Sequence, residues 1–386
     1  MKHDSSISIC KGLAIILMVI GHAEAPGAIC AFIYEFHMPL FFITAGYFFN
    51  LKYLNDEATF VKRRLKGLYV PFVKWAFFFL IIHNLMFKWG ILNEKYGNFQ
   101  GGVTHPYSWH QLQQNFWNII TAMGGYDEFL AGAFWFFRAL LVASILFLVL
   151  FQLGVTADKS FCRLFNKTWR DCQESSSTAL RIGGSIVVVL FLVMVWKSSE
   201  QLRMITLVQG GDRDLMGCMF FGIGFLLRYV LHRIPQTWWL TLAYASVVVA
   251  GATWFTASMT FRISLHHVLA LPVPALLGFL MTYNVSVVIN RHESLLKRFL
   301  VYCGDNTLCV FVFHIVAFKV VSLIKIWYYG LDWLQIGCHM VIHEHSQEDL
   351  FWILYSIAGV GIPLSVNYLY SNLRSRVCRN HTIHRI

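Results

Sequence analysis

The chain has 386 residues, of which 57% are hydrophobic and only 13% are charged, and its mean hydropathy is +0.57. Soluble globular proteins carry about 25% charged residues, so this composition excludes a soluble protein and indicates an integral membrane protein. The formal net charge of +11 is explained by basic loops that face an anionic lipid leaflet, and we expect no nucleic-acid partner. Of the cysteines, only Cys338 falls in a predicted outer loop, so no disulfide framework is expected.

Ten segments are apolar and long enough to cross a bilayer, which requires about 20 residues of helix. No cleavage pattern follows the first segment, and we expect it to insert uncleaved. The segments cover approximately residues 7–23, 29–49, 68–89, 133–153, 180–196, 214–231, 238–259, 268–289, 299–322 and 350–371. We therefore predict an all-α polytopic membrane protein with a single domain, residues 1–386.

Lys and Arg residues are distributed unevenly between the loops on the two sides. If the N-terminus is cytoplasmic, the inside segments hold roughly three times as many of them as the outside segments. The positive-inside rule then predicts that both termini are cytoplasmic, and we expect the plasma (inner) membrane to be the location. The longest outer connection, residues 91–132, is rich in Trp, Tyr, Asn, Gln and His, which bind sugars but also line membrane interfaces.

The first predicted span contains SICKGLAIILMVIGHA, residues 8–23, with Lys11 and His22 as its ionisable residues. Eleven residues at about 100° each return to nearly the same face of a helix, about 16 Å further along its axis. Taken singly, Lys11 could be a snorkelling anchor and His22 an interfacial histidine. Their alignment, with Ser8 within about 60° of the same face, favours a shared cavity inside the protein.

More ionisable residues lie within the predicted spans than helix packing explains. Glu35 and His37 are expected about a third to halfway across the second span, where Pro39 would loosen the helix. The others are Lys74, Arg138, Asp305, His314 and Lys319. Such residues face a bundle interior or a wet cavity and commonly mark function.

Four stretches of the chain, in order, read KGLAIILMVIGH, FHMPLFFITAGYFF, WFFRALLVASIL and GDNTLCVFVFHIV. They resemble blocks of the acyltransferase 3 family of multi-span membrane proteins, which acylate cell-surface carbohydrates and other extracytoplasmic acceptors. The chain departs from the family in having Lys11 where Arg is usual and Ser8 where an acidic residue is common. The family's cytoplasmic RxxR pattern corresponds most nearly to Arg63 and Lys66.

The resemblance implies an O-acyltransferase that moves an acetyl or other acyl group from cytoplasmic acyl-CoA to a hydroxyl of a surface or lipid-linked carbohydrate. Neutral histidine is suited to taking a hydroxyl proton, and we predict His22 as the general base. Lys11 would hold a phosphate or the thioester end of the donor, or stabilise negative charge on the carbonyl oxygen. Glu35 would orient an imidazole, most simply that of His22.

Acetyl-CoA is the donor that the resemblance predicts. Its phosphates would lie near the basic residues that follow the second span, where charge-assisted contacts are available. These residues are Lys62, Arg63, Arg64 and Lys66. A basic loop at this place is also what topology alone requires, so both interpretations stay open.

Four further residues are predicted to bind substrate: His37, Arg138, His314 and Asp305. For His314 and Asp305, a structural role is an equal alternative. The expected partners are acyl-CoA, a carbohydrate or glycolipid acceptor and the lipid bilayer, and a homo-oligomer stays open.

Other functions are compatible with parts of the sequence. The outer loop CHMVIHEHS has Cys338, His339, His343 and His345 at a spacing that could bind zinc, although we expect no metal cofactor. A transporter or a flippase for a glycan would also need buried ionisable residues, but the chain lacks internal repeats and paired broken helices. A non-catalytic scaffold for an exopolysaccharide synthase is a third alternative.

Overall fold

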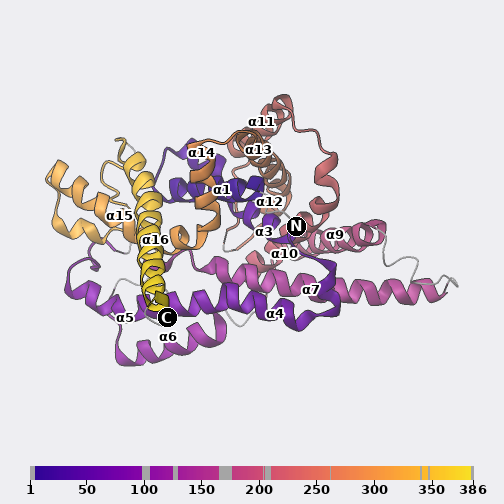
Figure 1. The fold of residues 1–386 in the computed structure, drawn as a ribbon, viewed down its shortest axis with the longest axis horizontal. Coiled ribbons are helices and arrows are strands. Elements are labelled where there is room, and N and C mark those ends of the chain that lie inside the picture. The colour runs from indigo at the N-terminus through magenta and orange to yellow at the C-terminus, as the bar shows by residue number, and fades with distance from the viewer. Residues whose placement is uncertain are drawn as a thin grey trace.

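The computed structural model describes residues 5–97, 105–124, 129–164, 176–202, 204, 210–260, 262–339, 341–346 and 348–383. Throughout these residues the regular elements are helices (Figure 1). The α-helices are α1 (Ser5–His22), α2 (Gly27–Tyr34), α3 (His37–Tyr47), α4 (Glu57–Arg64), α5 (Val70–Lys88), α6 (Trp109–Ala122), α7 (Trp135–Leu164), α9 (Ser176–Ser199), α10 (Gly211–Val230), α11 (Trp238–Trp254), α12 (Leu265–Ala270), α13 (Pro272–Asn290), α14 (Leu295–Asp305), α15 (Thr307–Tyr329) and α16 (Phe351–Ile383). A π-helical segment, η2 (Leu65–Tyr69), joins α4 to α5, and short 3-10 helices are η1 (Leu51–Asn55), η3 (Phe129–Ala131), η4 (Leu231–Arg233) and η5 (Trp333–Gly337).

In the described part of the chain, nine helical segments are long and apolar enough to cross a membrane. They coincide with nine of the ten segments predicted from the sequence. The remaining one, 238–259, contains α11, an apolar helix that ends at Trp254 after 17 residues. At 1.5 Å per residue it is about 26 Å long, somewhat shorter than the hydrocarbon core of about 30 Å.

The second predicted span is interrupted rather than continuous. The chain leaves the helix after Tyr34, and Phe36 has φ −143°, outside the helical region, before α3 begins at His37. Pro39 therefore lies in the first turn of α3, where its missing N–H costs no hydrogen bond, and it does not loosen a helix as predicted. The interruption lets Phe36 pack on Gly278 of α13, where a Cβ would overlap the phenyl ring.

The ninth predicted span, 299–322, is also two helices, α14 and α15, which meet at Asn306. Glycines bring α14 against α1, because a Cβ on Gly12 would overlap Leu300 O and one on Gly304 would overlap Ser8 O. Asp305 thus ends a short helix beside α1 instead of lying within a continuous span. This corrects the prediction that Asp305 and His314 share one helix.

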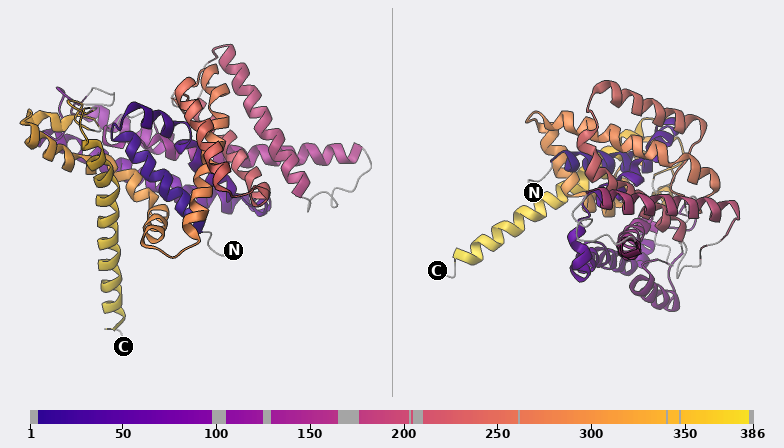
Figure 2. Two further views of the ribbon diagram at one scale, coloured as in Figure 1. Left: turned by 90° about the horizontal axis from the view of Figure 1, so that it is seen from above. Right: turned by 90° about the vertical axis from the view of Figure 1, so that its right-hand side faces the viewer.

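Helix α1 lies at the centre of the bundle and contacts α2, α3, α13, α14, α15 and α16. On another side, α10 packs against α3, α7 and α9. The C-terminal part of α16 projects away from the other helices, which both views of Figure 2 show. Functional side chains on α1 are therefore enclosed by helices from both halves of the chain.

Candidate functional site

His22 is the last residue of α1, and its ring lies against the ring of His314 on α15. His22 Nδ1 is 2.9 Å from His314 Nε2, and the two ring centroids are 5.1 Å apart. His314 is fully buried. The pairing leaves no signal in the sequence, because the two residues are 292 positions apart.

The hydrogen bonds of this pair determine the tautomers of both rings when the rings are neutral. His314 Nδ1 is 2.9 Å from Phe311 O and 3.1 Å from Val310 O, and since a carbonyl oxygen only accepts, Nδ1 carries the proton. His314 Nε2 is then an acceptor, and His22 Nδ1 donates to it. The other nitrogen of the neutral ring, His22 Nε2, has no proton, which is the state that a general base requires.

A cavity of about 270 Å³, here called the histidine cavity, borders the His22 ring. His37 also lines it, and His37 Nδ1 is 2.9 Å from Ile33 O, so this nitrogen donates and Nε2 can accept a hydrogen bond. The cavity is lined by Met18, His22, Tyr34, His37, Met38, Ala133, Trp135, Arg213, Ser258, Met259, Thr260 and Phe311. The polar groups that border this one small space are therefore two imidazoles, the aliphatic hydroxyls of Ser258 and Thr260, the phenol of Tyr34 and one guanidinium.

A second cavity of about 260 Å³, here called the lysine cavity, is bordered by Lys11. Its lining is mostly apolar, with Thr44 and Thr307 as the polar exceptions beside Lys11. It is lined by Lys11, Ile15, Met18, Met38, Phe41, Thr44, Ala45, Phe48, Gly67, Leu68, Phe136, Phe137, Leu140, Thr307, Leu308 and Phe311. Lys11 therefore borders a mostly apolar space rather than the polar surroundings of His22.

Met18, Met38 and Phe311 line both cavities and form the wall between them. These three side chains come from α1, α3 and α15, so the wall depends on three different helices. The prediction of a single cavity shared by Lys11 and His22 is thereby corrected to two adjoining cavities. Lys11 and His22 lie on opposite sides of the wall.

Asp305 supplies a carboxylate close to Lys11. Ser8 Oγ donates a hydrogen bond to Asp305 Oδ1 over 2.8 Å, and Asp305 interacts electrostatically with Lys11. The close contact of α14 with α1 brings this side chain to Ser8, although the two residues are 297 positions apart. An acidic group is thus present beside position 8 even though position 8 itself is a serine.

Glu35 does not contact His22, which corrects the prediction that its carboxylate orients that ring. Glu35 Oε1 accepts a hydrogen bond from Ala257 N over 2.8 Å, and Glu35 Oε2 has no hydrogen-bond partner among the described residues. The carboxylate lies beside Gly251 near the end of α11, because the interruption between α2 and α3 turns residue 35 away from α1. His314 holds the position at His22 that was predicted for Glu35.

The four basic residues predicted for the donor lie where α4 continues into η2. Arg63 donates to Tyr53 Oη over 2.8 Å, and the Arg64 guanidinium lies 5.1 Å from the centroid of the Phe60 ring. Lys62 and Lys66 are exposed. Gly67 and Leu68 of η2 line the lysine cavity, so this cavity begins directly after the basic segment.

Arg138 lines neither cavity. Its Nη2 is 3.5 Å from Asp214 Oδ2, and it packs on Gly210, whose φ of +119° favours glycine. The ion pair connects α7 to α10, an arrangement that supports a structural role. Contact between Arg138 and substrate stays a prediction.

Three residues that sequence analysis missed line the histidine cavity: Tyr34, Trp135 and Arg213. Tyr34 Oη donates to Gly21 O over 2.7 Å, and the Arg213 guanidinium lies 4.1 Å from the centroid of the Trp135 ring. Trp135 is the first residue of the family-like block WFFRALLVASIL, and Tyr34 lies two positions before the block FHMPLFFITAGYFF, so these blocks are the signal that could have identified both residues. Arg213 resembles an ordinary basic loop residue in the sequence.

Two histidines of the outer loop, His343 and His345, pair with carboxylates. His343 Nδ1 is 2.7 Å from Glu24 Oε1, and His345 Nδ1 is 3.1 Å from Glu348 Oε2. Within the part of the chain that the structure describes, no group of three or more His, Cys, Asp and Glu side chains is arranged to hold a metal ion. The contact between His343 and Glu24 instead joins this loop to the end of α1.

Comparison with known protein families gives a match that covers most of the chain. A family model described as an acyltransferase domain, that of the acyltransferase 3 family, matches residues 4–370. Neither the curated proteins nor the solved structures gave a match. The matched range includes every residue that lines the two cavities. The chain therefore belongs to the acyltransferase 3 family and is a multi-span membrane acyltransferase.

Proposed function

We propose that this protein transfers an acetyl or similar short acyl group from cytoplasmic acyl-CoA to a hydroxyl of a surface or lipid-linked carbohydrate, with His22 as the general base. The plasma (inner) membrane is the proposed location, with both termini cytoplasmic. The observation that carries the proposal is the pair of adjoining cavities, one bordered by Lys11 and the other by His22. This arrangement suits two substrates that arrive from opposite sides of a membrane.

The lysine cavity is the proposed donor site. Its mostly apolar lining suits the narrow arm of acetyl-CoA, with the acyl thioester at the wall that adjoins the histidine cavity. The exposed ammonium groups of Lys62 and Lys66 would bind the CoA phosphates at the surface, directly before the residues of η2 that line the cavity. Arg63 and Arg64 would support this surface while held by their own aromatic partners.

The distance along α1 favours one of the two roles considered for Lys11. Lys11 and His22 are separated by eleven residues, or about 16 Å of helix. An extended lysine side chain covers only about 6 Å of this distance, so its ammonium cannot reach a carbonyl group that reacts beside His22. In this proposal Lys11 therefore binds the donor. Arg213, which lines the histidine cavity and donates from Nε to Met259 O, would place its positive charge near a carbonyl oxygen there.

In the proposed reaction, the unprotonated His22 Nε2 takes the proton of the acceptor hydroxyl. The acceptor hydroxyl oxygen attacks the thioester carbonyl carbon while its proton passes to His22 Nε2. The tetrahedral intermediate, whose oxyanion faces Arg213, collapses with cleavage of the C–S bond. The CoA thiolate leaves and takes up the proton from His22 Nε2, which restores the neutral ring. His37 Nε2 would accept a hydrogen bond from another hydroxyl of the acceptor.

Transfer of label from acetyl-CoA tests the proposal. Membranes containing the wild type or a His22→Ala variant are incubated with radiolabelled acetyl-CoA, and label in the extracted glycans is counted. The variant should lose about 10²- to 10⁴-fold of the rate, the usual contribution of a general base. His292→Ala removes an exposed histidine outside both cavities and should leave the rate unchanged. Full transfer by His22→Ala would sink the assignment, and movement of unmodified glycan across vesicles without thioester consumption would favour a transporter.

A further inference from the structure

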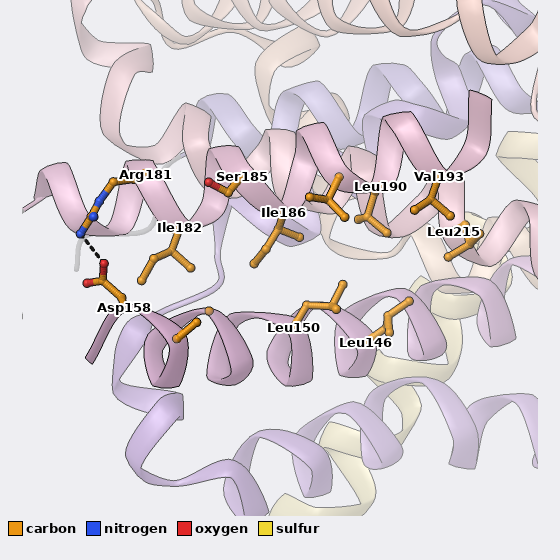
Figure 3. Close-up of a pocket in the computed structure, with 13 residues that line it drawn as sticks. Leu146, Leu150, Asp158, Arg181, Ile182, Ser185, Ile186, Leu190, Val193 and Leu215 are labelled. Carbon is orange, nitrogen blue, oxygen red and sulfur yellow. Dashed lines mark ion pairs between the residues drawn. The ribbon is translucent and has the colours of Figure 1, made fainter. Parts of the chain in front are cut away.

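A groove of about 650 Å³ runs between α7 and α9, apart from both cavities of the proposed active site. Figure 3 shows apolar side chains of the two helices facing each other across it, among them Leu146, Leu150, Ile186 and Leu190. From Leu146 to Asp158 the groove follows α7 for about 18 Å. This length is close to the thickness of one leaflet, about 15 Å of hydrocarbon.

One end of the groove is polar. Arg181 Nη2 is 2.7 Å from Asp158 Oδ1, and Figure 3 shows this ion pair at the end of the apolar rows. The side chain of Arg181 is 53% exposed, whereas that of Asp158 is 8% exposed. Arg181 therefore offers guanidinium N–H groups to a ligand while the carboxylate holds its orientation.

Asp158 also lacks a hydrogen-bond donor for one of its carboxylate oxygens. Its Oδ2 atom is buried and has no hydrogen-bond partner among the described residues. A buried carboxylate oxygen without a donor is costly, and a ligand that brings a donor to this end of the groove would relieve that cost. The polar end thus presents a cationic group to an anion and a carboxylate to a cation, side by side.

We propose that the groove binds one zwitterionic phospholipid with a primary ammonium head group, such as phosphatidylethanolamine. An acyl chain lies along the apolar side chains, the phosphate binds Arg181, and the ammonium donates to Asp158. The ion pair has no net charge, so it offers no surplus positive charge to an acidic head group. Lys159, the next residue of α7, points about 100° away from Asp158 and does not line the groove.

This lipid site is independent of the proposed reaction, because none of its lining residues lines either cavity. The experiment that tests it therefore measures lipid binding and not acyl transfer. Detergent-purified, delipidated protein is titrated with phosphatidylethanolamine or phosphatidylglycerol of identical acyl chains, and bound lipid is counted by native mass spectrometry. We expect the wild type to prefer phosphatidylethanolamine.

Three variants and one control separate the contribution of the head group to binding from that of the acyl chain. Arg181→Gln should lower phosphatidylethanolamine binding about fivefold, the effect of one interfacial cation. Asp158→Asn should reduce the preference for phosphatidylethanolamine over phosphatidylglycerol. Ser185→Phe should lower binding of both lipids because it fills the groove, and Val188→Phe, on an exposed face of α9 outside the groove, should change neither.

A second measurement does not depend on a stable groove variant. A photoreactive residue at Val189, which lines the groove, should crosslink to phosphatidylethanolamine in otherwise unmodified protein, and one at Val188 should crosslink far less. Equal crosslinking at both positions, equal or stronger binding of phosphatidylglycerol by the wild type, or a change of oligomeric state in Ser185→Phe without lipid loss would each overturn the proposal.

Discussion

At the scale of single residues, the properties of His22 depend on the atom that its Nδ1 faces. His314 presents an acceptor nitrogen to His22 because its own Nδ1–H is held by backbone carbonyls one turn earlier in α15. This chain of hydrogen bonds leaves His22 Nε2 unprotonated without help from any carboxylate. His314 is accordingly a positioning residue in the proposed reaction, and its replacement tests that role.

Two substitutions at His314 distinguish orientation from simple packing. In His314→Ala, His22 Nδ1 loses its acceptor, and we expect kcat to fall by up to about 10²-fold with little change in KM for acetyl-CoA. In His314→Gln, the side-chain carbonyl can accept from His22 Nδ1, and much of kcat should return. Initial rates at varied acetyl-CoA concentration measure both constants. Equal loss in the two variants would contradict the orienting role.

Lys11 also depends on a residue far away in the sequence. The Ser8 hydroxyl holds Asp305 in place, and Asp305 provides the negative charge near Lys11 that position 8 lacks. The departure from the family pattern at Ser8 is therefore compensated in space. A cation beside a carboxylate can remain charged at the edge of a membrane protein, where an isolated one is costly.

At the scale of elements, two interruptions in helices determine where the functional side chains lie. The interruption after Tyr34 directs Glu35 toward the end of α11 and starts α3 at His37. The one at Asn306 ends α14 at Asp305 and lets α15 begin a new direction toward His22. Backbone breaks of this kind are tolerated at membrane depth because they are buried in protein.

The close contact between α1 and α14 gives a prediction about stability. In Gly304→Ala, the added methyl group would overlap Ser8 O and push α14 away from α1, which should cost about 1–3 kcal/mol. Gly184→Ala on α9 is the matched control, because its Cβ would meet no atom within 4 Å. Thermal unfolding in detergent measures both. A Gly304→Ala midpoint equal to that of Gly184→Ala would show that α14 adjusts without cost.

At the scale of the whole molecule, two spaces of similar size meet at a wall of three side chains. Two of these are methionines, which adopt many conformations and fill irregular gaps. In the proposed reaction this wall lies where the acyl group passes from donor to acceptor. The size of the wall should therefore limit the length of acyl chain that the protein transfers.

Shortening one wall residue tests this limit. Met38→Ala should raise the rate with butyryl-CoA relative to acetyl-CoA by about fivefold or more, since each buried methylene contributes about 0.8 kcal/mol. Met281→Ala removes a half-buried methionine of α13 outside both cavities and should leave the ratio unchanged. Rates with the two donors are compared within each variant, so a general loss of activity cancels. A ratio that changes equally in both variants would exclude the wall as the determinant.

Composition and apolar runs by themselves determined that the chain is an all-α, multi-span membrane protein. A run of about 20 apolar residues forms a helix that is just long enough to cross the hydrocarbon core of a bilayer. Helical spacing placed Lys11 and His22 on the inner face of α1, and short family-like blocks indicated the family that the model match confirms. These features depend on residues close together in the chain.

Only the tertiary structure decided which side chains meet. The pairs His22–His314 and Ser8–Asp305 join residues almost 300 positions apart, and helix periodicity carries no information about such contacts. The partner of Glu35 was predicted wrongly because of one backbone interruption that an apolar run does not reveal. This interruption turns the Glu35 side chain away from α1 and toward the end of α11. The wall between the cavities depends in the same way on three helices at once, since a cavity is set by packing in space and not by any single segment.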